Sequence, residues 1–272
     1  MAWRRSAERA CLGFLREEME APGRSVMGRI RNANGKREGF FILFRICFFT
    51  RKNPVTTLTS PPLAPLLDRL FLQAAAATSP AIASISREER ERLMHSKTEY
   101  LDLYGRMKDL WLPVSRETGV LLYQLARSMN ARNIVEFGTS FGLSTLYMAA
   151  ALRDNGGGRL ISSEFEPSKI AKAREHLTEG GVSDLVEIRE GDALKTLAVD
   201  LPQTIDLVLL DGAKALYPDI LALVESRLRP GALIVADNAD HSPEYLARVR
   251  ASDGGYLSVP FAADVELSMR VG

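Results

Sequence analysis

Short apolar runs rich in β-forming residues alternate with helical stretches through the second half of this chain. The runs lie at residues 134–137, 160–163, 185–188, 205–210 and 232–236. Strands and helices that alternate in this way predict a parallel sheet with helices on both faces. A closing pair of strands is predicted at 255–259 and 265–271, around a loop that contains Pro260. The sequence therefore predicts a doubly wound, seven-stranded α/β sheet.

Three helical patterns precede the first strand. The first follows Pro61 and spaces its leucines along one apolar face. The second begins at Ser86, where Glu89 three residues later gives capping-box spacing, and the third begins after Ser115. Residues 59–272 are therefore predicted to form one domain, in which three helices are added before the sheet.

Residues 1–58 mix arginine clusters, scattered glycines and one apolar run at 40–49 without helical or strand periodicity. We predict that they are a poorly ordered extension or the result of a wrongly assigned start codon. The apolar run is about half as long as a membrane span and Arg45 interrupts it, which argues against a spanning helix. Basic residues follow the run in place of a small-residue cleavage site, so a secretory signal is not expected.

The composition favours a small-molecule partner and a cytoplasmic location. Charged residues make up 25% of the chain and the formal net charge is +1, so neither nucleic acid nor an acidic membrane surface is the expected partner. The two cysteines, Cys11 and Cys47, both lie near the start. The body of the chain therefore has no disulfide framework and no thiolate metal site, which fits a reducing cytoplasm.

In an open parallel sheet, ligands bind beyond the carboxyl ends of the strands, and here each of the first five strands leads to an acid. These acids are Glu136, Glu164, Asp192, Asp211 and Asp237, the last followed by Asn238. The loop after Glu136 has Ser140 and Leu143 where a dinucleotide fingerprint requires glycine. A carboxylate at Glu136 suits an ammonium or sulfonium charge better than phosphates. Glu164 suits a ribose diol, or it is a solvated acid that caps the next helix.

Five motifs end the successive strands or follow them directly. They are Val135-Glu136-Phe137-Gly138 with Gly142 and Ser144, Glu164 in Ser-Glu-Phe-Glu-Pro, Gly191-Asp192-Ala193, Asp211-Gly-Ala-Lys214 with Tyr217, and Leu228-Arg-Pro-Gly231 leading to Ala236-Asp237-Asn238. With these motifs, residues 111–271 resemble the metal-dependent O-methyltransferases. This is the group that contains catechol O-methyltransferase and the caffeoyl-coenzyme A O-methyltransferases.

The resemblance implies a Rossmann-like methyltransferase fold and an enzyme that moves a methyl group from S-adenosylmethionine to a hydroxyl oxygen. It implies a homodimer as well. The donor residues it implies are Val114, Glu136, Gly138 and Ser144 for the methionine part, Glu164 for the ribose, Asp192 near the adenine, and Asp211. It assigns a divalent metal to Asp211, Asp237 and Asn238, and the role of general base to Lys214.

The chemistry of these residues supports a metal. Two carboxylates and an amide carbonyl are hard oxygen ligands, which suit magnesium best and manganese or calcium as well. A cation beside a phenol lowers the pKa of its hydroxyl, and Lys214 could then take the proton if its own pKa is depressed. The alternatives are a turn or helix cap for Asp237 and Asn238, and a solvated lysine at a helix start for Lys214.

The expected acceptor is a small phenolic or catechol-like molecule. The resemblance does not identify catechol itself as the acceptor, because the loop around Phe261 offers no obvious match for the acid with which catechol O-methyltransferase binds the second hydroxyl. Tyr100 and Tyr104 on the second helix could wall an aromatic pocket, although core or dimer packing is the favoured interpretation. Two alternative functions are a nicotinamide-dependent oxidoreductase on a similar sheet and a non-catalytic homologue that binds S-adenosylmethionine.

Overall fold

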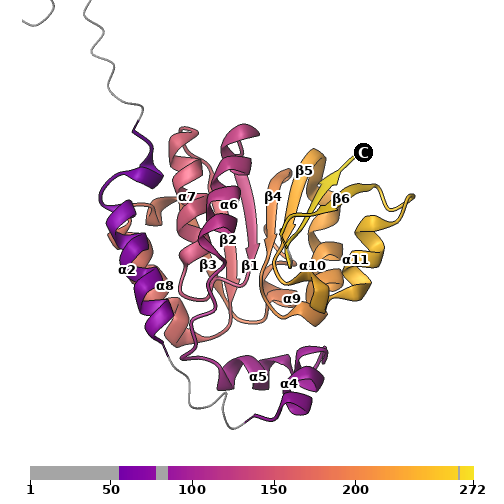
Figure 1. Ribbon diagram of the computed structural model, residues 1–272. Helices are drawn as coiled ribbons and strands as arrows, with labels where there is room; N and C mark the ends of the chain where they lie inside the picture. The colour runs from indigo at the N-terminus through magenta and orange to yellow at the C-terminus, as the bar shows by residue number, and fades with distance from the viewer. Residues whose placement is uncertain (1–54, 78–84, 263) are drawn as a thin grey trace, which may run out of the picture. The chain divides into compact units, whose positions relative to one another are not determined.

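The computed structural model describes residues 55–77, 85–262 and 264–272 (Figure 1). These residues form a seven-stranded sheet in the order β3-β2-β1-β4-β5-β7-β6. The strands are β1 (Asn133–Phe137), β2 (Arg159–Glu164), β3 (Val186–Glu190), β4 (Ile205–Leu210), β5 (Leu228–Ala236), β6 (Tyr256–Pro260) and β7 (Glu266–Arg270). The first five strands are parallel, and β7 runs antiparallel to both β5 and β6. The predicted doubly wound α/β fold is confirmed.

Helices cover both faces of the sheet (Figure 1). They are α2 (Leu63–Ala76), α4 (Arg87–Met94), α5 (Tyr100–Arg106), α6 (Arg116–Ser128), α7 (Leu143–Asp154), α8 (Pro167–Glu179), α9 (Ala193–Thr196), α10 (Tyr217–Val224) and α11 (Pro243–Arg250). Short 3-10 turns are η1 (Thr57–Thr59), η2 (Ser183–Leu185), η3 (Lys214–Leu216), η4 (Glu225–Arg227) and η5 (Ala239–His241). No helix in the described part of the chain is long and apolar enough to cross a membrane.

Two apolar cores lie on opposite faces of the sheet. One joins the sheet to α2, α6 and α7, and the other joins it to α9, α10 and α11. Because side chains alternate between the faces along a strand, Ile134 belongs to the first core and Val135 to the second. Both side chains are fully buried. The sheet is therefore fixed from both sides, which holds the ends of its strands in place.

The second predicted helix is two helices, α4 and α5. Ser86 caps α4 as expected, because its Oγ accepts a hydrogen bond from the backbone N–H of Glu89 at 3.1 Å. The helix then ends, and Ser96 Oγ accepts hydrogen bonds from the N–H groups of Thr98 and Glu99. A serine that binds nearby backbone groups competes with the helical hydrogen bonds, which explains the break. This break lets α5 turn to the edge where the parallel strands end (Figure 1).

Residues 1–54 lie outside the described residues, so the predictions for the 1–58 extension and for the apolar run at 40–49 stay predictions. The described chain begins just before η1. The backbone N–H of Thr57 donates to Asp154, and so does its hydroxyl at 2.5 Å. The last residues before the predicted domain boundary at 59 are thus attached to the end of α7.

Candidate active site

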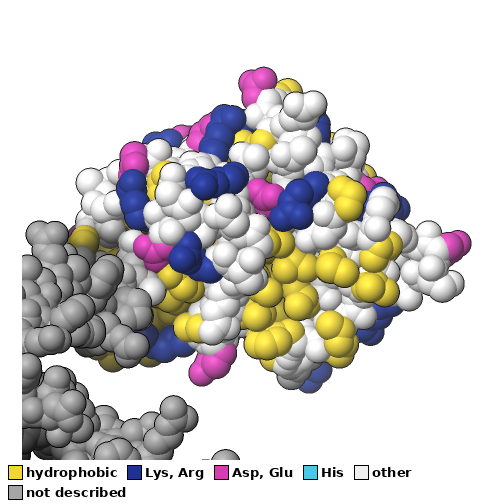
Figure 2. Space-filling model, turned by 90° about the horizontal axis from the view of Figure 1, so that it is seen from above, with side chains coloured by type: hydrophobic (Ala, Val, Ile, Leu, Met, Phe, Trp, Pro, Cys, Tyr) yellow, Lys and Arg dark blue, Asp and Glu magenta, His cyan; other side chains and the backbone are white. Residues whose placement is uncertain are grey.

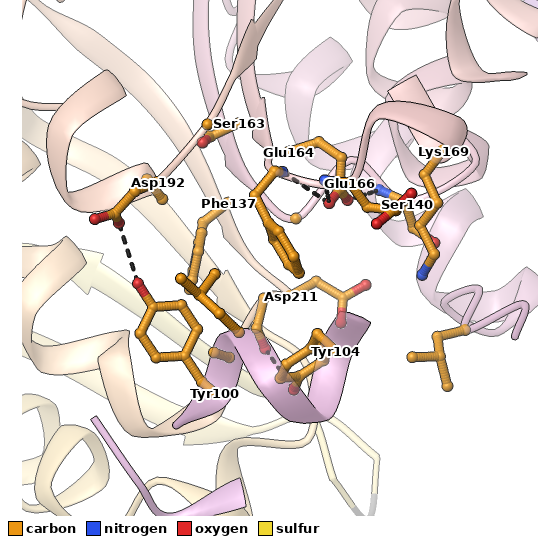
Figure 3. A pocket seen from close by; sticks show the side chains of 18 residues that line it. Tyr100, Tyr104, Phe137, Ser140, Ser163, Glu164, Glu166, Lys169, Asp192 and Asp211 are labelled. Carbon is orange, nitrogen blue, oxygen red and sulfur yellow. Dashed lines mark hydrogen bonds between the residues drawn. The ribbon is translucent and has the colours of Figure 1, made fainter. Parts of the chain in front are cut away.

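A pocket of about 660 Å³, open to solvent on one side, lies at the carboxyl ends of the parallel strands (Figure 3). The side chains that line it come from the ends of β1 to β4, from α5 and from the first turn of α8. They include Tyr100, Tyr104, Phe137, Ser140, Glu164, Phe165, Lys169, Asp192 and Asp211. Tyr100 and Tyr104 line this pocket and also pack against the apolar core, and core packing was one of the favoured interpretations from sequence.

A second, smaller pocket adjoins the first. It is lined by Val114 and Ser144, two of the residues predicted for the methionine part of a donor. Gly138, Ser140 and Asp211 line both pockets, so the two spaces meet at these residues. The structure therefore brings predicted residues of the glycine loop and of the ends of β2, β3 and β4 to two adjoining pockets, whereas Glu136 lines neither of them.

Gly138 is required by the close approach of two strand ends. Its backbone has φ +102°, a conformation that L side chains rarely adopt. A Cβ at this position would lie 2.6 Å from the carbonyl oxygen of Asp211. The glycine thus keeps the loop after β1 against the loop after β4, and the pocket opens between them.

Glu164 is an acceptor whose side chain is fixed by the backbone. One carboxylate oxygen accepts the N–H of Ser140 at 2.8 Å, and the other accepts the N–H groups of Phe165 and Glu166 at 2.9 and 3.0 Å. A carboxylate offers about four acceptor positions, so capacity for a ligand hydroxyl remains. The cap of α8 is a different residue, because Glu166 itself accepts the N–H of Ser168.

Asp192 caps α9 and also reaches the pocket. Its Oδ1 accepts the N–H of Leu194 at 3.0 Å and the hydroxyl of Tyr100 at 3.2 Å. Burial and the nearby Asp192 charge raise the pKa of Tyr100 to about 12. The hydrogen bond ties α5 to the sheet edge, so α5 forms a fixed wall of the pocket (Figure 3).

Glu136 is fully buried behind the glycine loop. Its carboxylate accepts hydrogen bonds from the hydroxyls of Ser144, Thr145 and Ser162 at 2.5, 2.7 and 2.6 Å. Burial raises the pKa of Glu136 to about 7, although the three hydroxyls lower it and the Asp211 charge raises it slightly further. Glu136 therefore acts on the cavity through its charge and through Ser144, which lines the second pocket.

Asp211 and Lys214 form a buried pair at the end of β4. Lys214 Nζ donates to Asp211 Oδ1 at 3.0 Å and to the hydroxyl of Tyr217 at 2.9 Å. The Tyr217 hydroxyl donates in turn to the backbone carbonyls of Leu210 and Asp237. Burial lowers the pKa of Lys214, but its polar neighbours raise it more, so the pKa lies well above the ordinary value. Lys214 is thus an ammonium group in this arrangement.

Asp237 and Asn238 lie beside Asp211 because β4 and β5 are neighbours. Leu210 pairs with Ala236, and the N–H of Asp237 donates to the Leu210 carbonyl at 2.9 Å. Burial, and then the charge of Asp211, raise the pKa of Asp237 to about 7. Asn238 takes a left-handed conformation with φ +48° and donates its side-chain N–H to Asp264 at 3.2 Å. Asp211 and Asp237 are therefore close enough to interact, and Asn238 follows Asp237 in the chain with its side chain on Asp264.

Two polar residues of the site were missed by sequence reasoning. Asp264 lies in the loop before β7 and reaches Asn238, so this loop does supply an acid beside the predicted metal ligands. Its position two residues before the last strand was the available signal. Lys169 lines the main pocket from α8 and is 5% exposed. It stands on a charged helical stretch, and no pattern in the sequence distinguishes it from a surface lysine.

Comparison with known proteins agrees with this geometry. Residues 135–239 match the family model described as a methyltransferase domain. Over this region the chain is similar to class I O-methyltransferases. Catechol O-methyltransferase from Niastella koreensis is 38% identical over 130 residues, which cover 47% of this chain and 58% of the relative. Catechol O-methyltransferase B from Danio rerio is 32% identical over 174 residues, which cover 61% of this chain and 65% of the relative. The chain thus spans less than two thirds of these relatives.

Solved structures of O-methyltransferases share the fold. The enzyme from Bacillus cereus, determined with S-adenosylhomocysteine, matches with a TM-score of 0.56 at 21% identity, over 71% of this chain and 94% of that one. The enzyme from Streptomyces achromogenes that is involved in tomaymycin synthesis, determined with S-adenosylmethionine, matches with a TM-score of 0.54. It is 26% identical over 75% of this chain and 95% of that one. These structures agree with the predicted fold.

Proposed function

We propose that this protein transfers a methyl group from S-adenosylmethionine to a hydroxyl oxygen of a small phenolic or catechol-like acceptor. The observation that supports it best is one pocket that gathers Glu164, Asp192 and Asp211 from the carboxyl ends of β2, β3 and β4. Two solved structures of the same fold contain this donor or its product, and curated relatives are named catechol O-methyltransferase.

The donor is proposed to lie with its nucleoside in the larger pocket. Glu164 has acceptor capacity left for ribose hydroxyls, and the rings of Tyr100 and Phe165 offer flat apolar walls for a base. The methionine part would extend past Gly138 into the smaller pocket. The surrounding carboxylates favour the positive charge of a sulfonium group.

A divalent cation fits the acids at the ends of β4 and β5. Asp211 and Asp237 lie close enough for one to raise the pKa of the other, and a cation relieves the repulsion of two such carboxylates. We propose Asp211, Asp237 and Asn238 as its ligands, with magnesium the preferred ion. When bound, the ion would lower the pKa of an acceptor hydroxyl. Among the described residues, no three His, Cys, Asp or Glu side chains form a metal cluster, and the proposed set has two carboxylates and an amide.

Lys214 is proposed as the residue that takes the hydroxyl proton. Its Nζ is buried and donates to Asp211, a residue that lines both pockets. Tyr217 holds it in place through a second hydrogen bond. As an ammonium it can stabilise an oxyanion but cannot accept a proton. We propose that it becomes a base when a divalent cation lies beside it, because that cation would lower the lysine pKa and would engage Asp211, which together with Tyr217 raises this pKa.

Asp264 is a further candidate for the acceptor. It lies beside Asn238, in the loop for which the sequence comparison with catechol O-methyltransferase offered no acid. A carboxylate there could accept a second hydroxyl of a catechol. We therefore propose that Asp264 makes the protein prefer acceptors with two adjacent hydroxyls over acceptors with a single hydroxyl.

We also propose that the protein forms a homodimer. Hydrophobic side chains gather in one part of the face that Figure 2 shows. On the edge strand β6, Leu257 and Val259 are 64% and 55% exposed, and Phe261 lines a shallow groove with Val120 of α6. An exposed apolar edge strand is a site where a second copy can pack. Val259→Asp should make the protein monomeric in sedimentation velocity, whereas Val199→Asp, at a comparably exposed valine elsewhere, should not.

Calorimetry with purified protein tests the donor site, and a methylation assay tests the reaction. We expect S-adenosylhomocysteine to bind without added metal, and methylation of a catechol to require magnesium and stop with a chelator. Asp211→Ala should abolish turnover. Retained methylation under a strong chelator would contradict the metal, and failure of the wild type to bind S-adenosylhomocysteine would contradict the whole proposal. Donor binding without methylation of any phenol would favour the non-catalytic alternative.

A further inference from the structure

Lys169 is a buried cation that the proposed reaction does not use. It stands in the first turn of α8, and its side chain enters the main pocket beside Glu166 and Ser140 (Figure 3). The residue is 5% exposed. By contrast, Lys172 one turn later has a side chain that is 57% exposed and pairs with Glu175. A lysine held inside a pocket loses its hydration, so its presence needs a compensating partner.

The partners that the protein itself supplies are weak. Among the described residues, the acceptor that Lys169 Nζ reaches is Ser140 Oγ, at 3.4 Å. The ammonium also lies 5.4 Å from the centre of the Phe141 ring. Burial lowers the pKa of Lys169, and the nearby charges of Glu164, Glu166 and Asp211 raise it in part. An ammonium has three donors, so two of them are left for a ligand.

The position of Lys169 identifies the part of the ligand that it faces. Ser140, its hydrogen-bond partner, lines both pockets, so the ammonium lies where the larger pocket passes into the smaller one. Asp211 lines the same junction and is near enough to influence the Lys169 pKa. A cation and a carboxylate at one junction match a zwitterion, which carries one charge of each sign.

We infer that Lys169 binds the α-carboxylate at the amino-acid end of the donor, while Asp211 at the junction faces its α-ammonium group. The inference rests on the proposed function, because it takes S-adenosylmethionine as the ligand. Within that ligand the carboxylate is the one anionic group. Lys169 would therefore act as a positioning residue that fixes the methionine end and so directs the methyl group.

The test compares three ligands that differ at the amino-acid end. S-Adenosylhomocysteine carries the zwitterion, its decarboxylated analogue keeps the amine, and methylthioadenosine lacks both groups. Titration calorimetry on the full chain would measure each of them with the wild type, Lys169→Met and Lys169→Arg. Lys172→Met on the exposed side of the same helix is the matched control.

We expect the wild type and Lys172→Met to prefer S-adenosylhomocysteine over the decarboxylated analogue by roughly ten- to a hundredfold, as for one hydrogen bond between charged groups. Lys169→Met should lose this preference and Lys169→Arg should keep most of it. Methylthioadenosine should bind all four proteins alike, which shows that the pocket is intact.

Three results would overturn the inference. Lys169→Met could keep the full preference for the ligand that carries the carboxylate. It could also lower the affinity for methylthioadenosine as much as the affinity for S-adenosylhomocysteine, which would mean that the lysine supports the structure of the pocket. A wild type that binds both zwitterion and decarboxylated analogue equally would also exclude it. If the wild type binds none of the three ligands, the proposed function itself fails, and this outcome is distinct from the others.

Discussion

Glu136→Gln should make the protein more stable at alkaline pH, because it removes a carboxylate that folding buries completely. The pKa of Glu136 is raised from 4.5 to about 7 in the folded protein. The folded state therefore holds a proton that the unfolded state releases at lower pH. Stability is lost as the pH rises from about 4.5 to about 7, and a shift of this size corresponds to about 3 kcal/mol in total. About 2 kcal/mol of it falls between pH 5.5 and 8.

The glutamine fits the same place. One oxygen of Glu136 accepts from Thr145 and Ser162, which the amide oxygen can also do. The other oxygen accepts from Ser144, whose hydroxyl can rotate to receive the amide N–H instead. The substitution therefore removes the charge and keeps the hydrogen bonds.

Urea unfolding of both proteins at several pH values from 5.5 to 8 measures this effect. We expect the difference in unfolding free energy to grow by about 2 kcal/mol in favour of the variant over that window. Asp237 titrates in both proteins, so its contribution cancels in the difference. Ser162→Ala, which removes one of the stabilising hydroxyls, should enlarge the loss in the glutamate protein. A difference that does not change with pH would refute the reasoning, since it would mean that the three hydroxyls offset burial completely.

Three further changes test the cavity. Gly138→Ala should lower the free energy of unfolding, measured in urea, by about 2 kcal/mol or more, because the new Cβ would lie 2.6 Å from the Asp211 carbonyl oxygen. The control is Gly105→Ala in α5, where nothing lies within 4 Å of the new Cβ and the protein should be stabilised by about 0.5 kcal/mol. Glu164→Gln should lower the affinity for S-adenosylhomocysteine, measured by calorimetry, roughly tenfold. An unchanged affinity would exclude Glu164 as the acceptor for the ribose hydroxyls. Lys214→Met should lower kcat about a hundredfold or more and leave S-adenosylhomocysteine affinity within about twofold, and equal losses in both would contradict its role as base.

Much of the fold could be predicted because the strands of a parallel sheet are apolar on both faces. The strand at 205–210 was predicted with its observed bounds, and its six residues are all buried. The strand predicted from residue 232 begins instead at Leu228. Pro230 and Gly231 read as a turn in the sequence, but the strand continues through them with a shift in register against β4. A bulge of this kind depends on the neighbouring strand, which a local pattern cannot reveal.

The positions of the acids could be predicted from the order of the strands, whereas the position of Lys169 could not. Each acid lies in the last residues of a strand or within two residues after it, so its place near the sheet edge follows from the strand order. Lys169 reaches the pocket from a helix, and which of its lysines turns inward depends on how α8 packs on the loop at Ser140. Tyr100 depends in the same way on the break between α4 and α5. Contacts between elements thus decide the residues that sequence reasoning missed.

The charges of the cavity bear on how the proposed enzyme would release its product. Glu164, Asp192, Asp211 and Lys169 all line the main pocket, so carboxylates outnumber the ammonium there. A donor with a sulfonium group brings a positive charge to these walls, and the transfer of its methyl group leaves a neutral thioether. The Coulomb attraction to the acids therefore falls in the step that makes the product. The contact between Lys169 and the carboxylate is common to donor and product and cannot distinguish them. Donor preference would then come from the acids, and Lys169→Met should reduce affinity for donor and product by the same factor.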